Sequence, residues 1–121
     1  MIKNGLLNWQ IIYKMNKEER KIEGYWYSKY EPDYPMPEPN VLTEDEAKEI
    51  YDLITDIEND KGVKNTQYRG WSTSRITEER LGSTEFSTNE WTWPCDFAKH
   101  YVLEHRVKPT DEFLNYIGYK K

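Results

Sequence analysis

The chain has 121 residues, and its 17 basic and 22 acidic side chains give a formal net charge of -5. This length suits a single domain. No apolar run approaches the roughly 18 residues that a membrane-spanning helix needs, and no signal-peptide pattern opens the chain. A single cysteine, Cys95, excludes an internal disulfide and suits a reducing compartment. We therefore expect a cytoplasmic protein without membrane association.

Aromatic side chains are abundant for so polar a chain. Ten Tyr, five Trp and three Phe make up 15% of the residues, beside 32% charged residues. Each large ring buries roughly 150–250 Å² when packed, so these rings can build a small core and disorder throughout the chain is not expected. Core packing is their ordinary role, but Tyr and Trp are also enriched at binding surfaces.

The N-terminal third contains two different segments. Residues 1–23 combine an apolar stretch with a charged run, and we expect an appendage or an edge element there. A single domain is expected over 24–121, beginning with a segment at 24–40 that contains four prolines. Because proline removes a backbone donor and extends the residue before it, we predict an extended, partly polyproline-like strap. Its rings Tyr25 and Trp26 either attach the strap to the domain or bind a protein partner.

The strongest local pattern predicts a helix over 43–60. Thr43 and Glu46 have the spacing of a capping box, and apolar residues recur at helical spacing on one side. The other side is acidic, since residues 32–60 contain ten acidic groups and one basic group. Such a face is ordinarily only solvated, but it also suits a protein that imitates nucleic acid. The candidate protein contacts on this face are Glu49, Asp52 and Asp56.

Residues 66–117 are predicted to form a hairpin-plus-helix module. We expect strands over 66–71, 84–88 and 90–93, a helix from Asp96 to about His105, and a short last helix after Pro109. The predicted fold is therefore α+β, a small antiparallel sheet or hairpin packed by two or three helices.

Cations and aromatic rings alternate within this module. If they converge, the rings would stack on a base while guanidinium groups hold a phosphate. The negative net charge excludes duplex nucleic acid as the expected partner, because phosphate contacts dominate such binding. The alternative is that the tryptophans belong to the core and the arginines pair with acids. The candidate ligand-binding residues for a nucleotide-like molecule are Tyr68, Arg69, Trp71, Arg75, Trp91 and Trp93.

Three motifs follow one another in the second half: Arg69-Gly70-Trp71-Ser72, Trp91-Thr92-Trp93-Pro94, and His100-Tyr101 with His105 and Val107. Together they resemble a family of small, uncharacterised bacterial and phage proteins. In the pattern of that family two cysteines stand at the positions of Ser74 and Thr77. The resemblance implies a degenerate zinc-finger-like second half and a phage or mobile-element origin, and it implies no activity.

The family pattern would combine C-x2-C with H-x4-H, the ligand types of a structural zinc site. Here Ser74 and Thr77 replace both cysteines, and hydroxyls are poor zinc ligands beside thiolates. His100 and His105 remain, but five residues of ideal α-helix rotate by about 500°, which separates the two side chains by some 140°, so they converge only if the helix ends or bends between them. Cys95, Asp96 or Glu104 could assist, although their spacing matches no standard zinc site. We therefore expect no cofactor, with a structural zinc at the two histidines as the alternative.

Binding is a better expectation than catalysis. The sequence contains no phosphate-binding glycine loop, metalloprotease motif or nucleophile elbow. We expect a noncatalytic acidic protein that binds a protein partner, and the resemblance adds an inhibitor or accessory factor of phage type. The second hypothesis is a protein that sequesters a nucleotide-like molecule. The third and weaker one is a metal-assisted hydrolase centred on His100 and His105.

Overall fold

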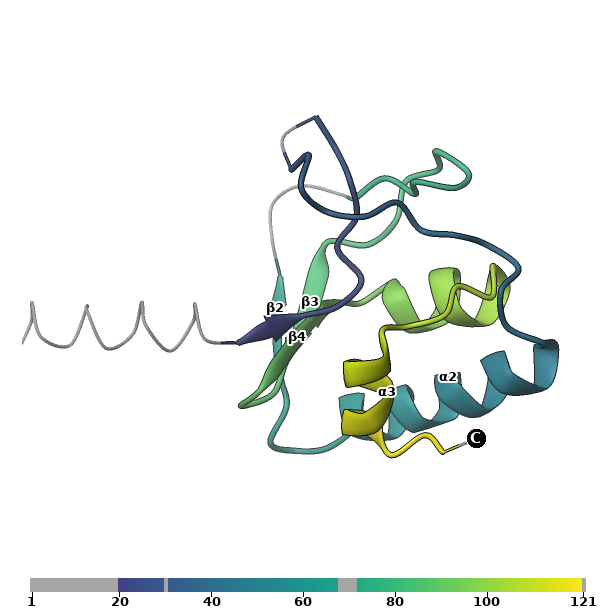
Figure 1. Cartoon of the computed structure of the whole chain (residues 1–121). Coiled ribbons are helices and arrows are strands. Elements are labelled where there is room, and N and C mark those ends of the chain that lie inside the picture. Colours follow the sequence, from purple (N-terminus) through teal and green to yellow (C-terminus); the bar gives the residue numbers. More distant parts are fainter. Residues whose placement is uncertain (1–19, 30, 68–71, 121) are drawn as a thin grey trace, which may run out of the picture.

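The computed structural model describes residues 20–29, 31–67 and 72–120. Its strands are β1 (Lys21–Ile22), β2 (Lys64–Gln67), β3 (Thr84–Ser87) and β4 (Trp91–Pro94). Its helices are α2 (Glu44–Glu58), the π-helix η1 (Phe97–Glu104) and α3 (Asp111–Ile117). Figure 1 shows the helices gathered on one side of a small sheet. The α+β prediction is confirmed, and no helix in the described part of the chain is long and apolar enough to cross a bilayer.

The sheet has the strand order β1-β4-β3-β2 and is mixed rather than purely antiparallel. The hairpin of β3 and β4 agrees with its prediction, with Phe86 opposite Trp93. The expectation of a purely antiparallel sheet is wrong, because β1 lies parallel to β4 with Lys21 opposite Trp91. Parallel pairs need long crossover connections, so no local sequence signal indicates this pairing. Part of the predicted appendage or edge element is thus an edge strand.

The helix α2 begins and ends close to its predicted bounds. The Thr43 hydroxyl accepts a hydrogen bond from the Glu46 N–H at 3.1 Å, and the Thr43 N–H donates to the Glu46 carboxylate at 2.9 Å. This is the predicted capping box. The apolar side of α2 packs against η1 and α3, with Ala47, Ile50 and Ile54 buried.

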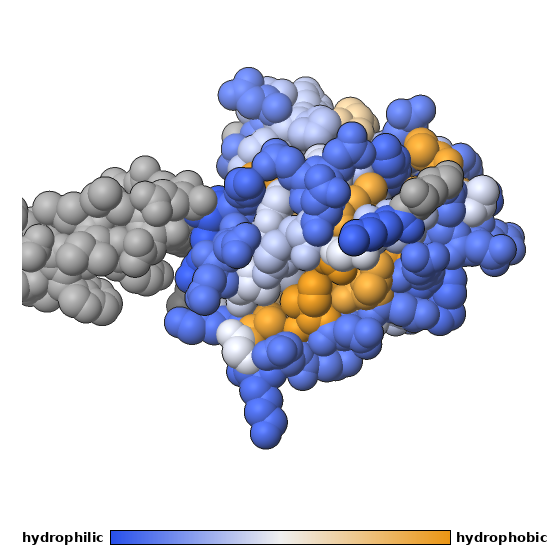
Figure 2. All heavy atoms as spheres, turned by 60° about the horizontal axis from the view of Figure 1, so that its bottom comes forward, coloured by the Kyte–Doolittle hydropathy of each residue, from blue (hydrophilic) through white to orange (hydrophobic). Residues whose placement is uncertain are grey.

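Aromatic rings form the centre of the core. The Phe113 ring of α3 meets the rings of Trp91, Trp93 and Phe97 edge-on, at centroid distances of 5.1, 5.4 and 5.7 Å. Each edge-to-face pair contributes about 0.5–1.5 kcal/mol beyond its buried area. These contacts hold α3 against both β4 and η1. Figure 2 shows a surface of mostly hydrophilic atoms, as the high charge content leads one to expect, with an apolar band and a few smaller apolar patches.

The strap over 24–40 is only partly extended. The Tyr27 N–H donates to the Pro35 carbonyl at 2.8 Å, and a tight turn joins Ser28 to Glu31. The chain therefore folds back on itself before it continues toward α2. Proline favours such turns as much as extended backbone, because both need the φ angle that its ring imposes. The strap is therefore not extended along its whole length.

Candidate functional site

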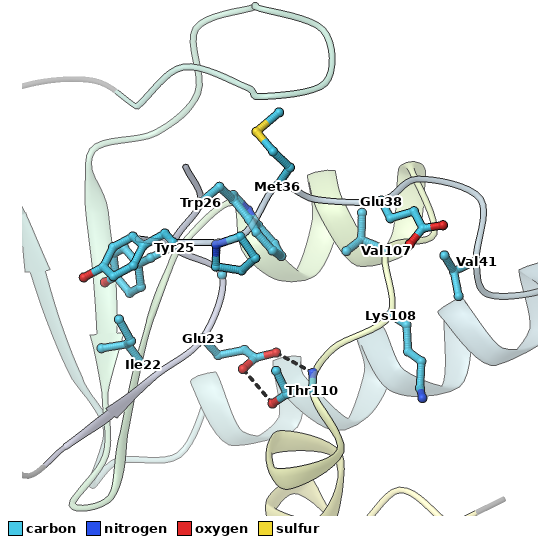
Figure 3. A pocket seen from close by; sticks show the side chains of 13 residues that line it. Ile22, Glu23, Tyr25, Trp26, Met36, Glu38, Val41, Val107, Lys108 and Thr110 are labelled. Carbon is cyan, nitrogen blue, oxygen red and sulfur yellow. Dashed lines mark hydrogen bonds between the residues drawn. The ribbon is translucent and has the colours of Figure 1, made fainter. Parts of the chain in front are cut away.

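A hollow of about 490 Å³ lies between the strap, the end of β1 and the segment leading into α3, and we call it the strap groove (Figure 3). Its apolar lining includes Ile22, Tyr25, Trp26, Met36, Val41 and Val107. Large apolar side chains are exposed at four places in the described part of the chain, and three of them line this groove. These three are Ile22, Met36 and Val41, with exposed fractions of 43%, 58% and 46%.

A buried carboxylate holds one wall of the strap groove in place. Glu23 accepts hydrogen bonds from the Thr110 N–H at 2.7 Å and from the Thr110 hydroxyl at 2.9 Å, as the dashed lines in Figure 3 show. Burial raises the pKa of the Glu23 carboxyl, and the two hydrogen bonds oppose that rise. Glu23 thus attaches the beginning of the strap to the N-terminal end of α3.

A second hollow, of about 350 Å³, shares Tyr25, Trp26 and Tyr34 with the strap groove. Arg75 also lines it, but its guanidinium donates to the backbone carbonyls of Tyr27 at 2.8 Å and Thr73 at 2.6 Å. The bond to Tyr27 joins the strap to the loop before β3, and the bond to Thr73 stays within that loop. Arg75 therefore has a structural role here, which leaves less of its hydrogen-bonding capacity for a phosphate.

The nucleotide-like site predicted from the sequence is not assembled by the described residues. Three of its members, Tyr68, Arg69 and Trp71, lie outside them. Trp91 and Trp93 are 4% and 0% exposed, and neither lines the hollow beside Arg75. The Trp93 indole N–H donates to Glu58 at 2.8 Å. Because enclosed rings offer no face to a ligand, Trp91 and Trp93 are not stacking residues, and the alternative that they belong to the core is confirmed.

The candidate protein contacts lie on two different elements. Glu49, Asp52 and Asp56 are exposed on the outer face of α2, where Asp52 pairs with Lys48 at 2.8 Å. Tyr25 and Trp26 are instead half-buried in the lining of the strap groove.

Trp26 attaches the strap to the domain. Its ring centroid lies 5.4 Å from that of Tyr101, and its indole N–H is enclosed without a partner among the described residues. The hydroxyl of the neighbouring Tyr25 donates to Glu85 of β3. Tyr25 and Trp26 therefore both anchor the strap to the domain and line the groove.

The two histidines lie side by side, contrary to the α-helical expectation. Their ring centroids are 4.7 Å apart. The reason is the π-helical geometry of η1, in which the His105 N–H donates to the His100 carbonyl at 3.1 Å. A bond from residue i+5 to residue i brings positions five apart to the same side of the helix. The separation expected for an ideal α-helix therefore does not apply to this π-helix, which ends between the two histidines.

Ser74 and Thr77, which stand where the family pattern has cysteines, have different surroundings. The Ser74 hydroxyl lies 2.7 Å from His100 Nε2 and accepts the N–H groups of Ile76 and Thr77 at 3.1 and 3.0 Å. The Thr77 hydroxyl donates to Glu79 at 2.9 Å instead. Ser74 is 1% exposed, so its contact with His100 orients the imidazole and gives no substrate access to the hydroxyl.

Glu104, one of three residues that the sequence offered as assisting ligands, completes the surroundings of the histidines. Its carboxylate lies 3.5 Å from His100 Nδ1, and the Glu79 carboxylate lies 3.7 Å from the same atom. His100, Glu104 and His105 each offer one ligand atom within 4.8 Å of the others. The i, i+4 spacing of His100 and Glu104 was a usable signal. The exposed apolar residues of the strap groove, by contrast, look like core residues in the sequence.

No protein-family model matches the chain, and comparisons with curated proteins and with solved structures found no significant match. The resemblance to small phage proteins stays a prediction.

Proposed function

We propose that the protein is a noncatalytic binding protein that takes up a segment of a protein partner in the strap groove. The observation that carries this proposal is the gathering of exposed Ile22, Met36 and Val41 around one hollow. Apolar patches that are rimmed by polar residues typically mark interaction sites in monomeric proteins. Covering a side chain of this size contributes about 1.5–3 kcal/mol. The partner segment therefore presents an aliphatic or aromatic anchor.

The acidic start of α2 beside the groove favours a basic partner, since the one basic residue among the described lining residues, Lys108, is paired with Asp111 at 3.1 Å. Val41 lies three residues before α2, whose first turn contains Glu44, Asp45 and Glu46. The exposed acids Glu49 and Asp56 extend this negative surface along the helix, whereas Asp52 is paired with Lys48. Such a field accelerates association with positive segments and weakens with salt. We infer a partner segment in which Lys or Arg follows the apolar anchor.

An inhibitor or accessory factor of phage type, acting in the cytoplasm, is the biological role in keeping with this proposal and with the sequence resemblance. The nucleotide-like alternative has less support. Arg75 is held by two backbone carbonyls, and the rings of Trp91 and Trp93 are enclosed in the core.

The test is selection of short random peptides on the immobilised full chain, followed by fluorescence-anisotropy measurement of the selected peptides. We expect sequences with one apolar anchor and adjacent Lys or Arg. The variants Met36→Asp and Val41→Asp should each weaken binding by about tenfold or more, the equivalent of ~1.4 kcal/mol. The double variant Glu44→Gln, Asp45→Asn should mainly slow association.

The matched control is Tyr27→Asp. Tyr27 is 44% exposed like the groove residues, but its side chain does not line the groove. Retained affinity in this variant, together with loss in the two groove variants, supports the proposal. Unchanged affinity in the groove variants, or equal loss in all three, contradicts it.

A further inference from the structure

We propose that His100, Glu104 and His105 form a binding site for a transition-metal dication, Zn²⁺ above all, at the end of η1. The three side chains offer one nitrogen or oxygen ligand each, and these atoms lie within 4.8 Å of one another. Small rotamer changes bring such atoms to the roughly 2.0–2.2 Å that zinc bonds to imidazole and carboxylate require. The site is separate from the strap groove, whose lining contains none of the three residues.

The backbone of η1 creates this convergence. Its i+5 to i hydrogen bond, from the His105 N–H to the His100 carbonyl at 3.1 Å, places the two imidazoles on one side of the helix. Glu104 lies one turn from His100 on the same side, with its carboxylate 3.5 Å from His100 Nδ1. In an α-helix the two histidines would diverge, so the π-helical turn is what brings two imidazoles and a carboxylate together.

Ser74 fixes the orientation of the His100 imidazole. Its hydroxyl contacts His100 Nε2 at 2.7 Å and is itself fixed by the N–H groups of Ile76 and Thr77. The other ring nitrogen, Nδ1, is thereby directed toward the carboxylates. The second nitrogen of a metal-binding histidine ordinarily donates its proton to such a partner, so zinc binding at Nδ1 requires the tautomer with the proton on Nε2, directed at the Ser74 oxygen. Ser74 therefore supports the site from behind and is not one of its ligands.

Charge and accessibility also fit a dication. The Glu104 and Glu79 carboxylates flank His100 Nδ1 at 3.5 and 3.7 Å, so two negative charges would balance one Zn²⁺. The imidazole of His100 is 6% exposed, whereas the side chain of Glu104 is 49% exposed and leaves access from solvent. Imidazole nitrogens with carboxylate oxygen suit zinc and its neighbours in the transition series, and they do not suit Mg²⁺ or Ca²⁺.

The experiment is titration of the chelator-treated full chain with ZnCl₂ by calorimetry, and with CoCl₂ by visible absorption. We expect one metal ion per chain and cobalt bands typical of nitrogen and oxygen ligands. The variants His105→Gln and Glu104→Gln should weaken zinc binding by more than about tenfold, since even a second-shell partner is worth roughly 10–100-fold. We use these two variants and leave His100 unchanged, because replacement of this buried residue would also disturb the packing of the core.

Two control variants complete the design. Glu49→Gln removes an exposed helical carboxylate far from the cluster in sequence, and Cys95→Ser removes the one thiol of the chain. Both should bind zinc like the parent. Zinc affinity of His105→Gln and Glu104→Gln within about threefold of the parent would overturn the proposal. Loss of binding in Cys95→Ser would overturn it as well, because the thiol would then be a ligand.

Discussion

Thr110 donates two hydrogen bonds to the buried carboxylate of Glu23, from its backbone N–H at 2.7 Å and from its hydroxyl at 2.9 Å. The same hydroxyl oxygen accepts the Phe113 N–H at 3.3 Å and so caps α3. One carboxylate thus joins the end of β1, the strap and the N-terminal end of α3. Because Phe113 occupies the centre of the aromatic core, this contact also positions the core packing.

Replacement of Glu23 tests the strength of this connection. We expect Glu23→Ala to lower the free energy of unfolding by about 2–3 kcal/mol, because hydrogen bonds to a charged group are lost inside the protein. Glu23→Gln keeps one acceptor oxygen and should cost about 1 kcal/mol. Urea unfolding of the parent and both variants measures the difference. A loss below about 0.5 kcal/mol for Glu23→Ala would show that the contact is not important for stability.

Burial of three carboxyls leads to a pH dependence of stability. Burial raises the pKa of Glu23, Glu58 and Asp96 above the ordinary values of 4.5, 4.5 and 3.8. A carboxyl whose pKa is higher in the folded state binds its proton more tightly there. Its contribution to the free energy of unfolding therefore falls as the pH rises from its ordinary pKa through the raised one.

The variant Glu58→Gln isolates one of these contributions, because an amide oxygen can still accept the Trp93 indole N–H. Relative to the parent, Glu58→Gln should become more stable as the pH is raised from about 5 to about 7. Thermal unfolding at both pH values measures this, with the exposed Glu49→Gln as a control whose relative stability should stay level. A parent-to-variant difference that moves in the opposite direction would exclude a raised pKa for Glu58.

Two glycines with nearly equal φ angles allow a matched comparison. Gly24 has φ +82°, and a Cβ added there would lie 2.6 Å from Cδ1 of Phe97. Gly118 has φ +84°, and a Cβ added there would meet no atom within 4 Å. We expect Gly118→Ala to cost about 1–2 kcal/mol for the left-handed backbone alone. Gly24→Ala adds overpacking against Phe97, about 1–3 kcal/mol more. Equal losses in chemical denaturation would show that the strap moves aside without cost.

Local signals in the sequence determined three elements of this protein. The capping box at Thr43 and the apolar spacing after it determined α2, and the turn residues between β3 and β4 determined the hairpin. The threonine before Asp111 determined the beginning of α3. Caps, turns and periodicity act within one or two turns of chain, so they are visible in the residues that form the element. The same periodicity predicted that the acidic side chains of α2 lie on its exposed side.

Only the tertiary structure decided the parallel pairing of β1, the burial of Trp91 and Trp93, and the π-helical geometry of η1. A tryptophan that packs in the core and one that stacks on a ligand have the same sequence neighbours. The shift from i+4 to i+5 hydrogen bonds in η1 likewise leaves no local pattern. It occurs where Phe97, Tyr101 and Val102 are buried against the rest of the domain. Packing over long sequence distances outweighs the small local preference for an α-helix, and it thereby brings His100 and His105 together.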